Sequence, residues 1–581
     1  MSATVVARPL RILRSEIPLG PYPERVGDDL VRWAAERPEQ VFLAERAGSE
    51  WRTITYARTL HHVRSIGGAL LAIGGPDHPI AVLAENGIDH ALVVLAAMHV
   101  GVPVAPLSVN YARAGADLDR LRALFAVLGP VAAFVPDPAL AEQVALTAPK
   151  LLLLRDVRDL RGDRETADAA FAGVGPGTTA KVLFTSGSTG TPKGVITTHR
   201  MLASNQTMLS QIWPEAVDDP VLVDWAPWSH VASGNKCFGL VLRNGGTLYV
   251  DDGRPLPGAF EATLRNLRTL APTFYFNVPR GYALLADALE HDEQLARTFF
   301  SRVRVLLNAG AAIHDSLRRR LAALAQQYAG REVPVVSAWG ATETAPMATA
   351  VWGPRPAAPE TVGTPVPGVE IKLAPVDDRW ELRVRGPSVT PGYWRNPEAT
   401  AAAFDEEGYY RSGDAAELLD PGDPSRGILF AGRINENFKL SSGTWVNVGV
   451  VRLATVEVTA PLLDDVVVAG ADQDVLGVLG FLNLAAAREL TGLPDAERHE
   501  LVTHPALRER LRALLVARNG RAGGTSQRVV RLLLLPDLPS GSEGEITDKG
   551  SVNQRRVLQR RAADVARLYA EPLDPQVLVI A

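Results

Sequence analysis

The most informative stretch runs from Lys181 to His199 and reads Lys-Val-Leu-Phe-Thr-Ser-Gly-Ser-Thr-Gly-Thr-Pro-Lys-Gly-Val-Ile-Thr-Thr-His. The apolar run Val182 to Phe184 is typical of a short buried strand, and a strand pattern resumes at Val195. Between them, hydroxyls and bare backbone N–H groups supply donors for phosphate oxygens, and glycines allow a close approach. Lys193 adds a mobile positive charge. The stretch therefore predicts a phosphate-binding loop between two strands that does not open a helix.

Three common motifs of similar composition fit this stretch less well. A Walker loop needs Gly directly before its Lys, and Pro192 stands there. A nucleophile elbow needs Gly-x-Ser-x-Gly, which neither Ser186 nor Ser188 provides. A flexible Gly/Ser linker is disfavoured because apolar strands flank the loop closely.

The composition is that of a globular protein with more than one core. A chain of 581 residues, 46% apolar and 22% charged, predicts a large domain and a smaller one. The net charge of −5 gives no reason to expect nucleic acid or an anionic membrane as the main partner. Cys237 is the only cysteine, which excludes a disulfide framework and a thiolate metal cluster. We expect it to be a small buried hydrophobe.

No segment has the pattern of a targeting or membrane-spanning sequence. Met1 to Pro18 lacks the sustained apolar stretch of a signal peptide, and no apolar run approaches the length that spans a bilayer. The expectation is a soluble cytoplasmic enzyme.

The N-terminal part alternates strand and helix patterns. The segments are, in order, a strand at Trp51–Tyr56, a helix through Leu71, a strand at Ile80–Leu83, a helix at Ile88–Val100 and a strand closing at Pro106. This alternation predicts a layered α/β domain. We expect Glu85 and Asn86 to cap the second helix.

Thr185 to Gly194 resembles the signature of the adenylate-forming superfamily, which includes acyl- and aryl-CoA synthetases and peptide-synthetase adenylation domains. The resemblance covers nearly the whole chain. It implies a large N-terminal layered α/β domain, acetyl-CoA synthetase-like, at 1–434, and a smaller mobile α+β C-terminal domain at 435–581. It also implies that ATP and a carboxylic acid give an acyl-adenylate and pyrophosphate, and that CoA then displaces AMP.

The same resemblance implies the nucleotide site. Trp339-Gly-Ala-Thr-Glu343 has Trp where the family has Tyr; Thr342 would reach the α-phosphate and Glu343 would hold Mg²⁺. Asp414 would accept from both ribose hydroxyls, with Arg433 sharing that site. The implied catalytic residues are Lys549, Thr342, Glu343 and Lys193. The implied ATP- and AMP-binding residues are Thr185, Ser186, Gly187, Ser188, Thr189, Gly190, Lys193, Gly310, Ala311, Ala312, Trp339, Gly340, Thr342, Asp414 and Arg433.

Two further segments resemble the family's acid pocket. Asp224 to Lys236 contains an aromatic and a histidine where family members place a gate beside the acid, and Thr273 to Pro279 lines the same pocket in the family. Plain packing is the alternative for these side chains. The implied substrate-binding residues are Trp228, His230, Ser233, Asn235 and Asn277.

Phe438-Lys-Leu-Ser-Ser-Gly-Thr-Trp-Val446 and the run Glu545-Ile-Thr-Asp-Lys-Gly550 resemble segments of the feruloyl-CoA synthase branch. Asn435 stands at the family's hinge, and the implied CoA-binding residues are Lys439, Ser442 and Gly443. The family's catalytic lysine lies in Gly-Lys-Ile, whereas this chain has Gly544-Glu545-Ile546. In the feruloyl-CoA synthase branch Lys549 would serve instead.

The resulting hypothesis is an ATP-dependent aryl-CoA ligase for a hydroxycinnamate such as ferulate, or for benzoate, that uses ATP, Mg²⁺ and CoA. It would act on small molecules as a monomer or homodimer. The alternatives are a fatty acyl-CoA ligase, an adenylation enzyme that loads a carrier protein, and a degenerate nucleotide-binding sensor suggested by Asn435 and Glu545.

Overall fold

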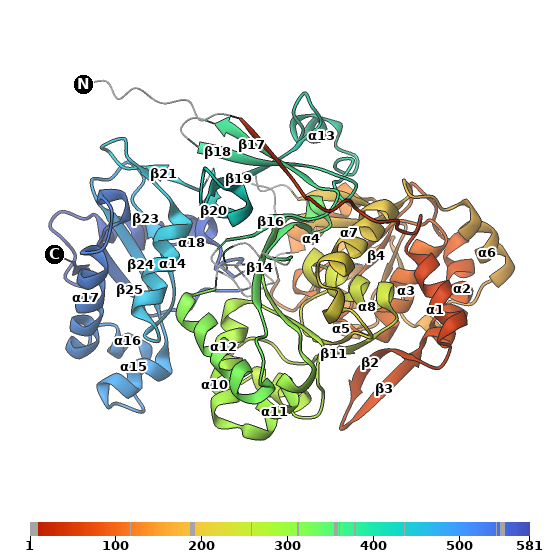
Figure 1. Ribbon diagram of the computed structural model, residues 1–581, viewed down its shortest axis with the longest axis horizontal. Helices are drawn as coiled ribbons and strands as arrows, with labels where there is room; N and C mark the ends of the chain where they lie inside the picture. The colour runs from red at the N-terminus through yellow and green to blue at the C-terminus, as the bar shows by residue number, and fades with distance from the viewer. Residues whose placement is uncertain are drawn as a thin grey trace. The chain divides into compact units, whose positions relative to one another are not determined.

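A computed structural model describes residues 10–116, 118–185, 192–256, 258–310, 313–353, 358, 361–376, 379–434, 436–541, 543–546 and 552–580 (Figure 1). The chain packs as two compact units. The first comprises 1–375, 382–412 and 418–429, and the second comprises 376–381, 413–417 and 430–581.

The sheet that carries the glycine-rich stretch has six strands in the order β7-β6-β4-β5-β8-β9. Its parallel strands are β4 (Ile80–Val82), β5 (Val104–Pro106), β6 (Ala132–Phe134), β7 (Leu152–Leu154) and β8 (Thr179–Thr185), and β9 (Lys193–Thr198) runs antiparallel to β8. The helices of this part of the chain are α1 (Gly27–Glu36), α2 (Tyr56–Leu71), α3 (Ile88–His99), α4 (Leu118–Leu128), α5 (Pro138–Thr147), α6 (Arg164–Gly173) and α7 (His199–Ile212). The prediction that strands flank this stretch on both sides is confirmed.

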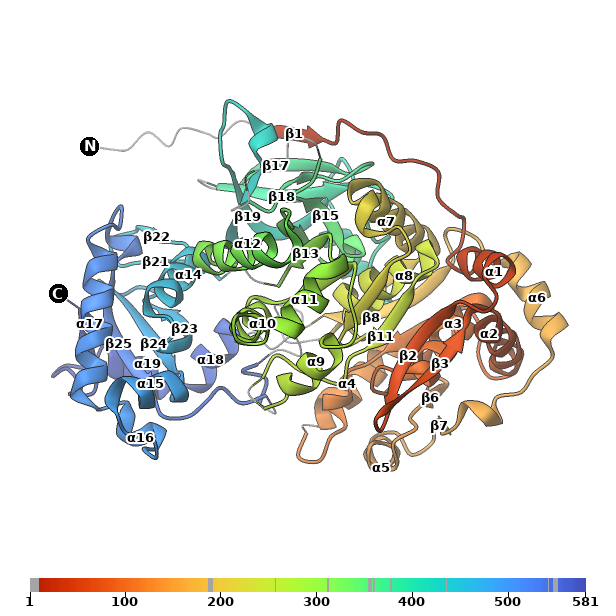
Figure 2. The same ribbon diagram turned by 60° about the horizontal axis from the view of Figure 1, so that its bottom comes forward.

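Two further sheets complete the α/β part of the first unit. One has the order β10-β11-β2-β3, with β2 (Val41–Ala47), β3 (Glu50–Thr55), β10 (Val221–Asp224) and β11 (Thr247–Val250). The other has the order β12-β13-β14-β15-β16, with β12 (Phe274–Asn277), β13 (Val305–Asn308), β14 (Val335–Gly340), β15 (Met347–Ala350) and β16 (Thr364–Pro365). The β2–β3 hairpin lies beside α2 and α3 (Figure 2).

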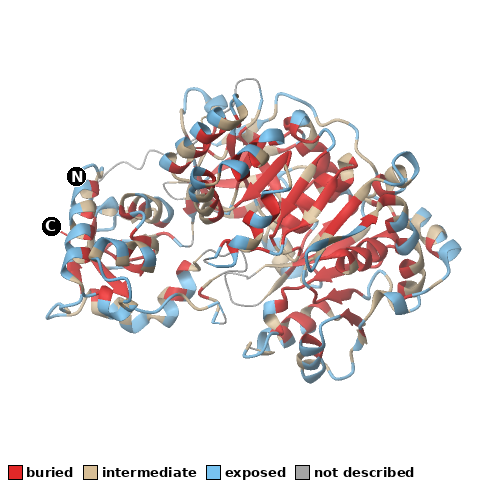
Figure 3. Ribbon diagram, turned by 90° about the horizontal axis from the view of Figure 1, so that it is seen from below, coloured by how far each residue is buried: buried red, intermediate tan, exposed pale blue. Residues whose placement is uncertain are grey.

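Helices and a second five-stranded sheet accompany these strands, and parts of that sheet belong to each compact unit. The helices are α8 (Phe238–Asn244), α9 (Phe260–Leu267), α10 (Pro279–His291), α11 (Glu293–Arg302), α12 (Asp315–Ala329) and α13 (Pro397–Ala402). A five-stranded sheet has the order β1-β17-β18-β19-β20, with β1 (Arg11–Arg14), β17 (Glu370–Val376), β18 (Arg379–Arg385), β19 (Tyr410–Leu418) and β20 (Ile428–Arg433). Central strands are buried, and exposed residues concentrate on the outer helices and loops (Figure 3).

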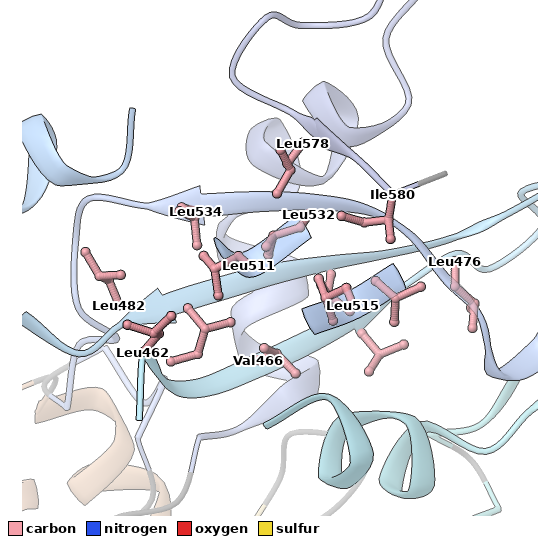
Figure 4. Packing of buried hydrophobic residues seen from close by; sticks show 14 of the residues in the cluster. Leu462, Val466, Leu476, Leu482, Leu511, Leu515, Leu532, Leu534, Leu578 and Ile580 are labelled. Atoms are coloured by element: carbon pink, nitrogen blue, oxygen red, sulfur yellow. The ribbon is translucent and has the colours of Figure 1, made fainter. Parts of the chain in front are cut away.

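The second unit has its own sheet and core. The sheet order is β23-β24-β25-β26, with β23 (Leu463–Ala469), β24 (Leu476–Leu482), β25 (Val529–Leu535) and β26 (Leu578–Val579). A hairpin of β21 (Phe438–Lys439) and β22 (Trp445–Val446) precedes α14 (Val448–Thr459), α15 (Leu484–Thr491), α16 (Arg498–Leu501), α17 (Pro505–Asn519), α18 (Gln554–Arg560) and α19 (Ala562–Leu568). Leucines and valines from the sheet and α17 fill the core on one face (Figure 4).

The start of α3 corrects one expectation. Glu85 and Asn86 do not cap this helix; instead Glu45 on β2 accepts the Ile88 N–H at 2.7 Å. The Glu85 carboxylate pairs with Arg113 at 2.5 Å. The Asn86 side-chain oxygen accepts a hydrogen bond from the Trp228 backbone N–H at 2.9 Å. The cap therefore comes from a strand distant in sequence.

Two smaller observations complete the fold. Cys237 is free and buried, as expected. Among the described residues, no helix is both long and apolar enough to cross a membrane.

Candidate functional site

The two strands that flank the glycine-rich loop place its ends opposite each other. Thr185, the last residue of β8, pairs with Lys193, the first residue of β9. Ser186, Gly187, Ser188, Thr189 and Gly190 lie outside the described residues. A third segment joins here, because the Trp394 N–H donates to the Gly194 carbonyl at 2.7 Å and the Ile196 N–H to the Gly392 carbonyl at 3.1 Å.

Tyr393 lies between two of the predicted catalytic residues. Its ring centre is 5.2 Å from Lys193 Nζ, and its hydroxyl donates to Glu343 Oε1 at 3.0 Å. Tyr410 is near enough to Tyr393 and Glu343 to interact electrostatically with both. The fold thus brings together Lys193 and Glu343, which are far apart in the sequence, on either side of Tyr393.

Both tyrosine hydroxyls are neutral donors. Burial, and next the negative charge of Glu343, raise the pKa of Tyr393 and of Tyr410 well above the ordinary range. Glu343 itself is buried, and its backbone carbonyl accepts from the Thr390 N–H at 2.8 Å. The Glu343 carboxylate is therefore held in one orientation by groups that do not titrate near neutral pH.

The sequence analysis missed Tyr393 and Tyr410. The sequence does contain a signal, because both tyrosines belong to short glycine–aromatic motifs, Gly392-Tyr-Trp394 and Gly408-Tyr-Tyr410. Nothing in the sequence, however, indicates which of these aromatic side chains faces Glu343.

The carboxylate chemistry around Glu343 fits a nucleotide-bound Mg²⁺. Among the described residues there is no group of three or more His, Cys, Asp or Glu side chains that could hold a metal. Mg²⁺ in phosphoryl-transfer sites is commonly bound by one or two carboxylates together with phosphate oxygens and water. A single buried Glu343 is consistent with that arrangement.

The expected adenine-side residues lie at the end of β14 and on the turn after β13. Trp339 is buried, and Gly340 follows it where a Cβ would come within 1.7 Å of the Pro346 carbonyl oxygen, so the turn requires glycine. Thr342 is half-buried in the short helical turn Thr342–Thr344. Gly310 adopts a φ of +89°, and Ala311 and Ala312 lie outside the described residues.

The expected ribose residues form an ion pair on neighbouring strands. Arg433 Nε, at the end of β20, lies 2.9 Å from Asp414 Oδ1 on β19. The Asp414 side chain is 5% exposed and the Arg433 side chain 50%. The guanidinium favours the ionised form of the carboxylate, which is the form that accepts two hydroxyl hydrogen bonds.

The expected acid-binding segment, Asp224 to Lys236, begins at the end of β10 and runs into a π-helix, Ala232–Cys237, whose polar side chains are mostly buried. The Ser233 hydroxyl donates to Asp224, and Asn235 Oδ1 accepts from Lys181 at 3.1 Å. Burial raises the pKa of Asp224 to about 6. π-Helical turns are rare and are frequently found at functional sites.

Trp228 and His230 stand just before this π-helix. Trp228 is buried, its ring meets His90 edge-on at 5.2 Å between centres, and its backbone N–H donates to Asn86 at 2.9 Å. His230 is half-buried, and its carbonyl accepts from Gly234 at 2.8 Å. The segment is therefore fixed at both ends by backbone hydrogen bonds.

Asn277 has a packing role in this structure. Its Oδ1 accepts from Trp225 at 3.2 Å and from the Val278 N–H at 2.9 Å, and its Nδ2 donates to the Tyr275 hydroxyl at 3.1 Å. Tyr275 in turn packs on Phe299 in the core. Both the oxygen and the nitrogen of the Asn277 amide are therefore hydrogen-bonded within the protein.

The expected CoA-binding residues form a tight hairpin. Lys439 is exposed, with Nζ 4.9 Å from the Trp445 ring centre. The Ser442 hydroxyl bonds to Thr444 at 2.9 Å, and Gly443 has a φ of +79° that favours glycine. Asn435 and Lys549 lie outside the described residues.

Glu545, at the position of the family's lysine, is a buried ion-paired carboxylate. Two bonds of 2.9 Å join it to Arg561, and the Ser540 N–H donates to it at 2.8 Å. Burial opposes ionisation, but the bonds from Arg561 and Ser540 outweigh it and lower the pKa of Glu545. These contacts indicate a structural role for Glu545.

Comparison with known proteins identifies the family to which the chain belongs. Residues 30–394 match the family described as "AMP-binding enzyme". The chain belongs to this family. A feruloyl-CoA synthase from an Amycolatopsis species is 30% identical over 378 residues, covering 63% of this chain and 71% of that protein. A putative fatty-acid–CoA ligase of Mycobacterium tuberculosis is 26% identical over 489 residues, covering 74% and 80%.

Solved structures show the same fold for this AMP-binding enzyme. The A domain of carboxylic acid reductase from Segniliparus rugosus, in complex with AMP and a co-purified carboxylic acid, has a TM-score of 0.72 at 19% identity, covering 94% of each chain. ATP-bound MatB from Rhodopseudomonas palustris has a TM-score of 0.69 at 22% identity, covering 93% of this chain and 99% of that one. The predicted α/β fold, with a large N-terminal and a smaller C-terminal domain, and membership of the adenylate-forming acid–CoA ligases are confirmed.

Proposed function

We propose that this AMP-binding enzyme is an ATP-dependent aryl-CoA ligase. It would convert an aromatic acid, a hydroxycinnamate such as ferulate or a benzoate, to its acyl-adenylate and then to the CoA thioester. The observation that carries the adenylation half is the position of Tyr393 between Lys193 and Glu343, at the end of the glycine-rich loop.

In the first half-reaction a carboxylate oxygen attacks the α-phosphorus of ATP, and the bond to pyrophosphate breaks. Both reactants are anions, so catalysis is mainly positioning and neutralisation of charge. Lys193 would neutralise phosphate oxygens and Thr342 would donate to the α-phosphate. Glu343 would hold Mg²⁺, which neutralises phosphate charge when bound. Lys549 would supply the cation that the family places in Gly-Lys-Ile.

The ribose would bind at Asp414. Its buried carboxylate, paired with Arg433 at 2.9 Å, is suited to accept from two hydroxyls. Both residues lie on adjacent strands and so have a fixed separation. By the family resemblance, Trp339 and the turn at Gly310 would contact the adenine.

In the second half-reaction the CoA thiolate attacks the acyl carbon and AMP leaves. We place the domain boundary at 434/435, with Asn435 as the hinge of a mobile C-terminal domain. Lys439, Ser442 and Gly443 would line the CoA channel. The tight hairpin at Gly443 and the exposed side chain of Lys439 support this assignment.

The preference for an aromatic acid rests on the feruloyl-CoA synthase relative and on the acid-binding segment. That segment contains the buried polar side chains Asp224, Asn235 and Lys236. Trp228 within the segment and Phe276 on β12 are buried aromatic side chains, and rings of this kind stack on planar acids.

Two alternatives have a specific observation behind them. The similarity to a putative fatty-acid–CoA ligase makes a fatty acid the alternative substrate. The similarity to a carboxylic acid reductase of Segniliparus rugosus, 27% identical over 433 residues, makes a carrier-bound thiol the alternative acceptor of the acyl group.

A pyrophosphate-exchange screen tests the proposal. The expected result is that hydroxycinnamates or benzoates give a higher kcat/KM than octanoate, and that CoA releases AMP and thioester. A higher kcat/KM for octanoate would assign the enzyme to the fatty acyl class. Exchange without thioester formation from CoA would favour a carrier protein as the acceptor, and absence of exchange with any acid would leave a nucleotide sensor.

A further inference from the structure

Lys181 is a buried lysine that neither the glycine-rich loop nor the chemistry above uses. It lies on β8, four positions before Thr185, and is 3% exposed. Its ammonium donates to the Gly234 carbonyl at 2.7 Å and to Asn235 Oδ1 at 3.1 Å. No carboxylate pairs with it in the part of the chain that the structure describes.

A lysine in this position is costly to keep. Removing an ammonium from water without an acidic partner is unfavourable, and burial lowers the pKa of Lys181 to about 7. A methionine or leucine would fill the same space without that cost. The role of Lys181 therefore follows from its two hydrogen bonds, to the Gly234 carbonyl and to Asn235 Oδ1.

Both acceptors belong to the π-helix Ala232–Cys237. Gly234 lies directly against Trp228, because a Cβ on Gly234 would come within 2.1 Å of the Trp228 carbonyl oxygen. The Gly234 N–H also donates to the His230 carbonyl at 2.8 Å. Fixing Gly234 consequently fixes Trp228 and His230 as well.

Other elements hold the same turn from other directions. Gln206 on α7 donates to the Asn235 carbonyl at 2.8 Å, Lys236 Nζ lies 3.3 Å from the Phe276 ring centre on β12, and Asn86 bonds to the backbone at Trp228. Of these contacts, the one from Lys181 comes from β8, the strand that leads into the glycine-rich loop. Lys181 therefore links the loop strand to the acid-binding segment directly.

We propose that Lys181 is a positioning residue that sets the acid-binding segment at a fixed distance from the glycine-rich loop. This inference rests on the proposed function. In-line attack requires the carboxylate oxygen and the α-phosphorus to be held together, and small displacements lower the rate steeply. Lys181 touches neither reactant; it acts through Gly234 and Asn235.

The kinetic test uses Lys181→Met, which keeps the length of the side chain and removes its donors. With the acid that the screen identifies, the KM for the acid should rise about tenfold or more because two buried acceptors lose their donor. The KM for ATP should stay within about threefold, since Lys181 makes no contact with the described nucleotide-site residues. The exposed Lys150→Met is the matched control and should leave both constants unchanged.

The structural test uses hydrogen exchange and needs no substrate. Amides of residues 228–238 should exchange faster in Lys181→Met than in the wild type, whereas amides in the second unit should not change. If Lys181→Met does not fold, Lys181→Gln, which keeps one donor group, carries both measurements with a smaller expected increase.

Three outcomes are decisive. Faster exchange at 228–238 together with a raised KM for the acid alone supports the inference. Unchanged exchange, or equal rises in both KM values, overturns it. A wild-type enzyme that activates no acid would instead refute the proposed function, and the exchange comparison would still decide whether Lys181 holds the segment.

Discussion

The Tyr393 hydroxyl donates a 3.0 Å hydrogen bond to Glu343 Oε1, although fifty positions separate the two residues in the chain. The contact is possible because Gly392 to Trp394 pair with β9 directly after the glycine-rich loop. The same tyrosine ring faces Lys193. Tyr393 therefore fixes the orientation of the Glu343 carboxylate relative to the end of the loop.

Removing that hydroxyl should weaken the use of ATP with Mg²⁺. In Tyr393→Phe the ring facing Lys193 remains, but Glu343 loses a buried donor, and a hydrogen bond to a charged group is worth about 1.5–3 kcal/mol. We expect kcat/KM for ATP to fall by about tenfold or more and the Mg²⁺ concentration at half-maximal rate to rise. Pyrophosphate exchange at varied Mg²⁺ measures both.

Tyr409→Phe is the control for this prediction. The Tyr409 hydroxyl also donates to a carboxylate, Glu370, at 2.8 Å, but it lies outside the site. Equal losses in the two variants would mean that Tyr393 contributes stability and not orientation of Glu343.

The predictions that succeeded depend on local pattern. The strands β8 and β9 could be predicted because their apolar residues are contiguous and the glycines and hydroxyls between them are unsuited to either strand or helix. Motif resemblance assigned Asp414 and Arg433 to one ribose site; the structure places the two side chains 2.9 Å apart, and their part in binding ribose stays a prediction.

The features that sequence could not give depend on tertiary contacts. Glu45, not Glu85 or Asn86, caps α3, because a strand from another sheet delivers its carboxylate there. In the sequence Lys181 stands at the start of an apolar strand pattern, and only the fold shows that its ammonium donates to the π-helix. Which of several adjacent tyrosines faces Glu343 is likewise set by the fold and not by spacing.

Glu545 should prove structural. Replacing it in Glu545→Gln removes the charge that pairs with Arg561, and breaking a buried ion pair typically costs about 3–5 kcal/mol. We expect a lower melting temperature, with pyrophosphate exchange per folded molecule within about threefold of the wild type. Glu543→Gln, at an exposed position, is the control and should melt normally. Normal stability with lost exchange would place Glu545 in the reaction.

Lys549 should matter for one half-reaction only. Loss of one electrostatic contact to a transition state typically costs about a hundredfold or more, so Lys549→Ala should depress pyrophosphate exchange by that factor. Conversion of a synthetic acyl-adenylate and CoA to thioester should persist. Near-normal exchange in Lys549→Ala would remove it from the adenylation step and direct attention to Lys439.

Buried histidines should make the enzyme sensitive to mild acid. His99 is buried and stacks on Phe171 with ring centres 4.1 Å apart, and burial lowers its pKa to about 4. The unfolded chain has an ordinary histidine pKa near 6.5 and so binds more protons between about pH 4 and 6.5. The contribution of neutral His99 to stability is therefore complete above pH 6.5 and is lost as the pH falls toward 4.

The variant His99→Gln isolates this contribution. Between pH 7 and pH 5 the free energy of unfolding of the wild type should fall by about 1–2 kcal/mol more than that of His99→Gln, because glutamine does not titrate. Denaturant unfolding at the two pH values measures the difference. The exposed His78→Gln should fall in parallel with the wild type. If His99→Gln also falls in parallel, the imidazole is protonated in the folded protein without cost, and the acid sensitivity must come from other groups such as His90 or His199, whose pKa values burial also lowers to about 4.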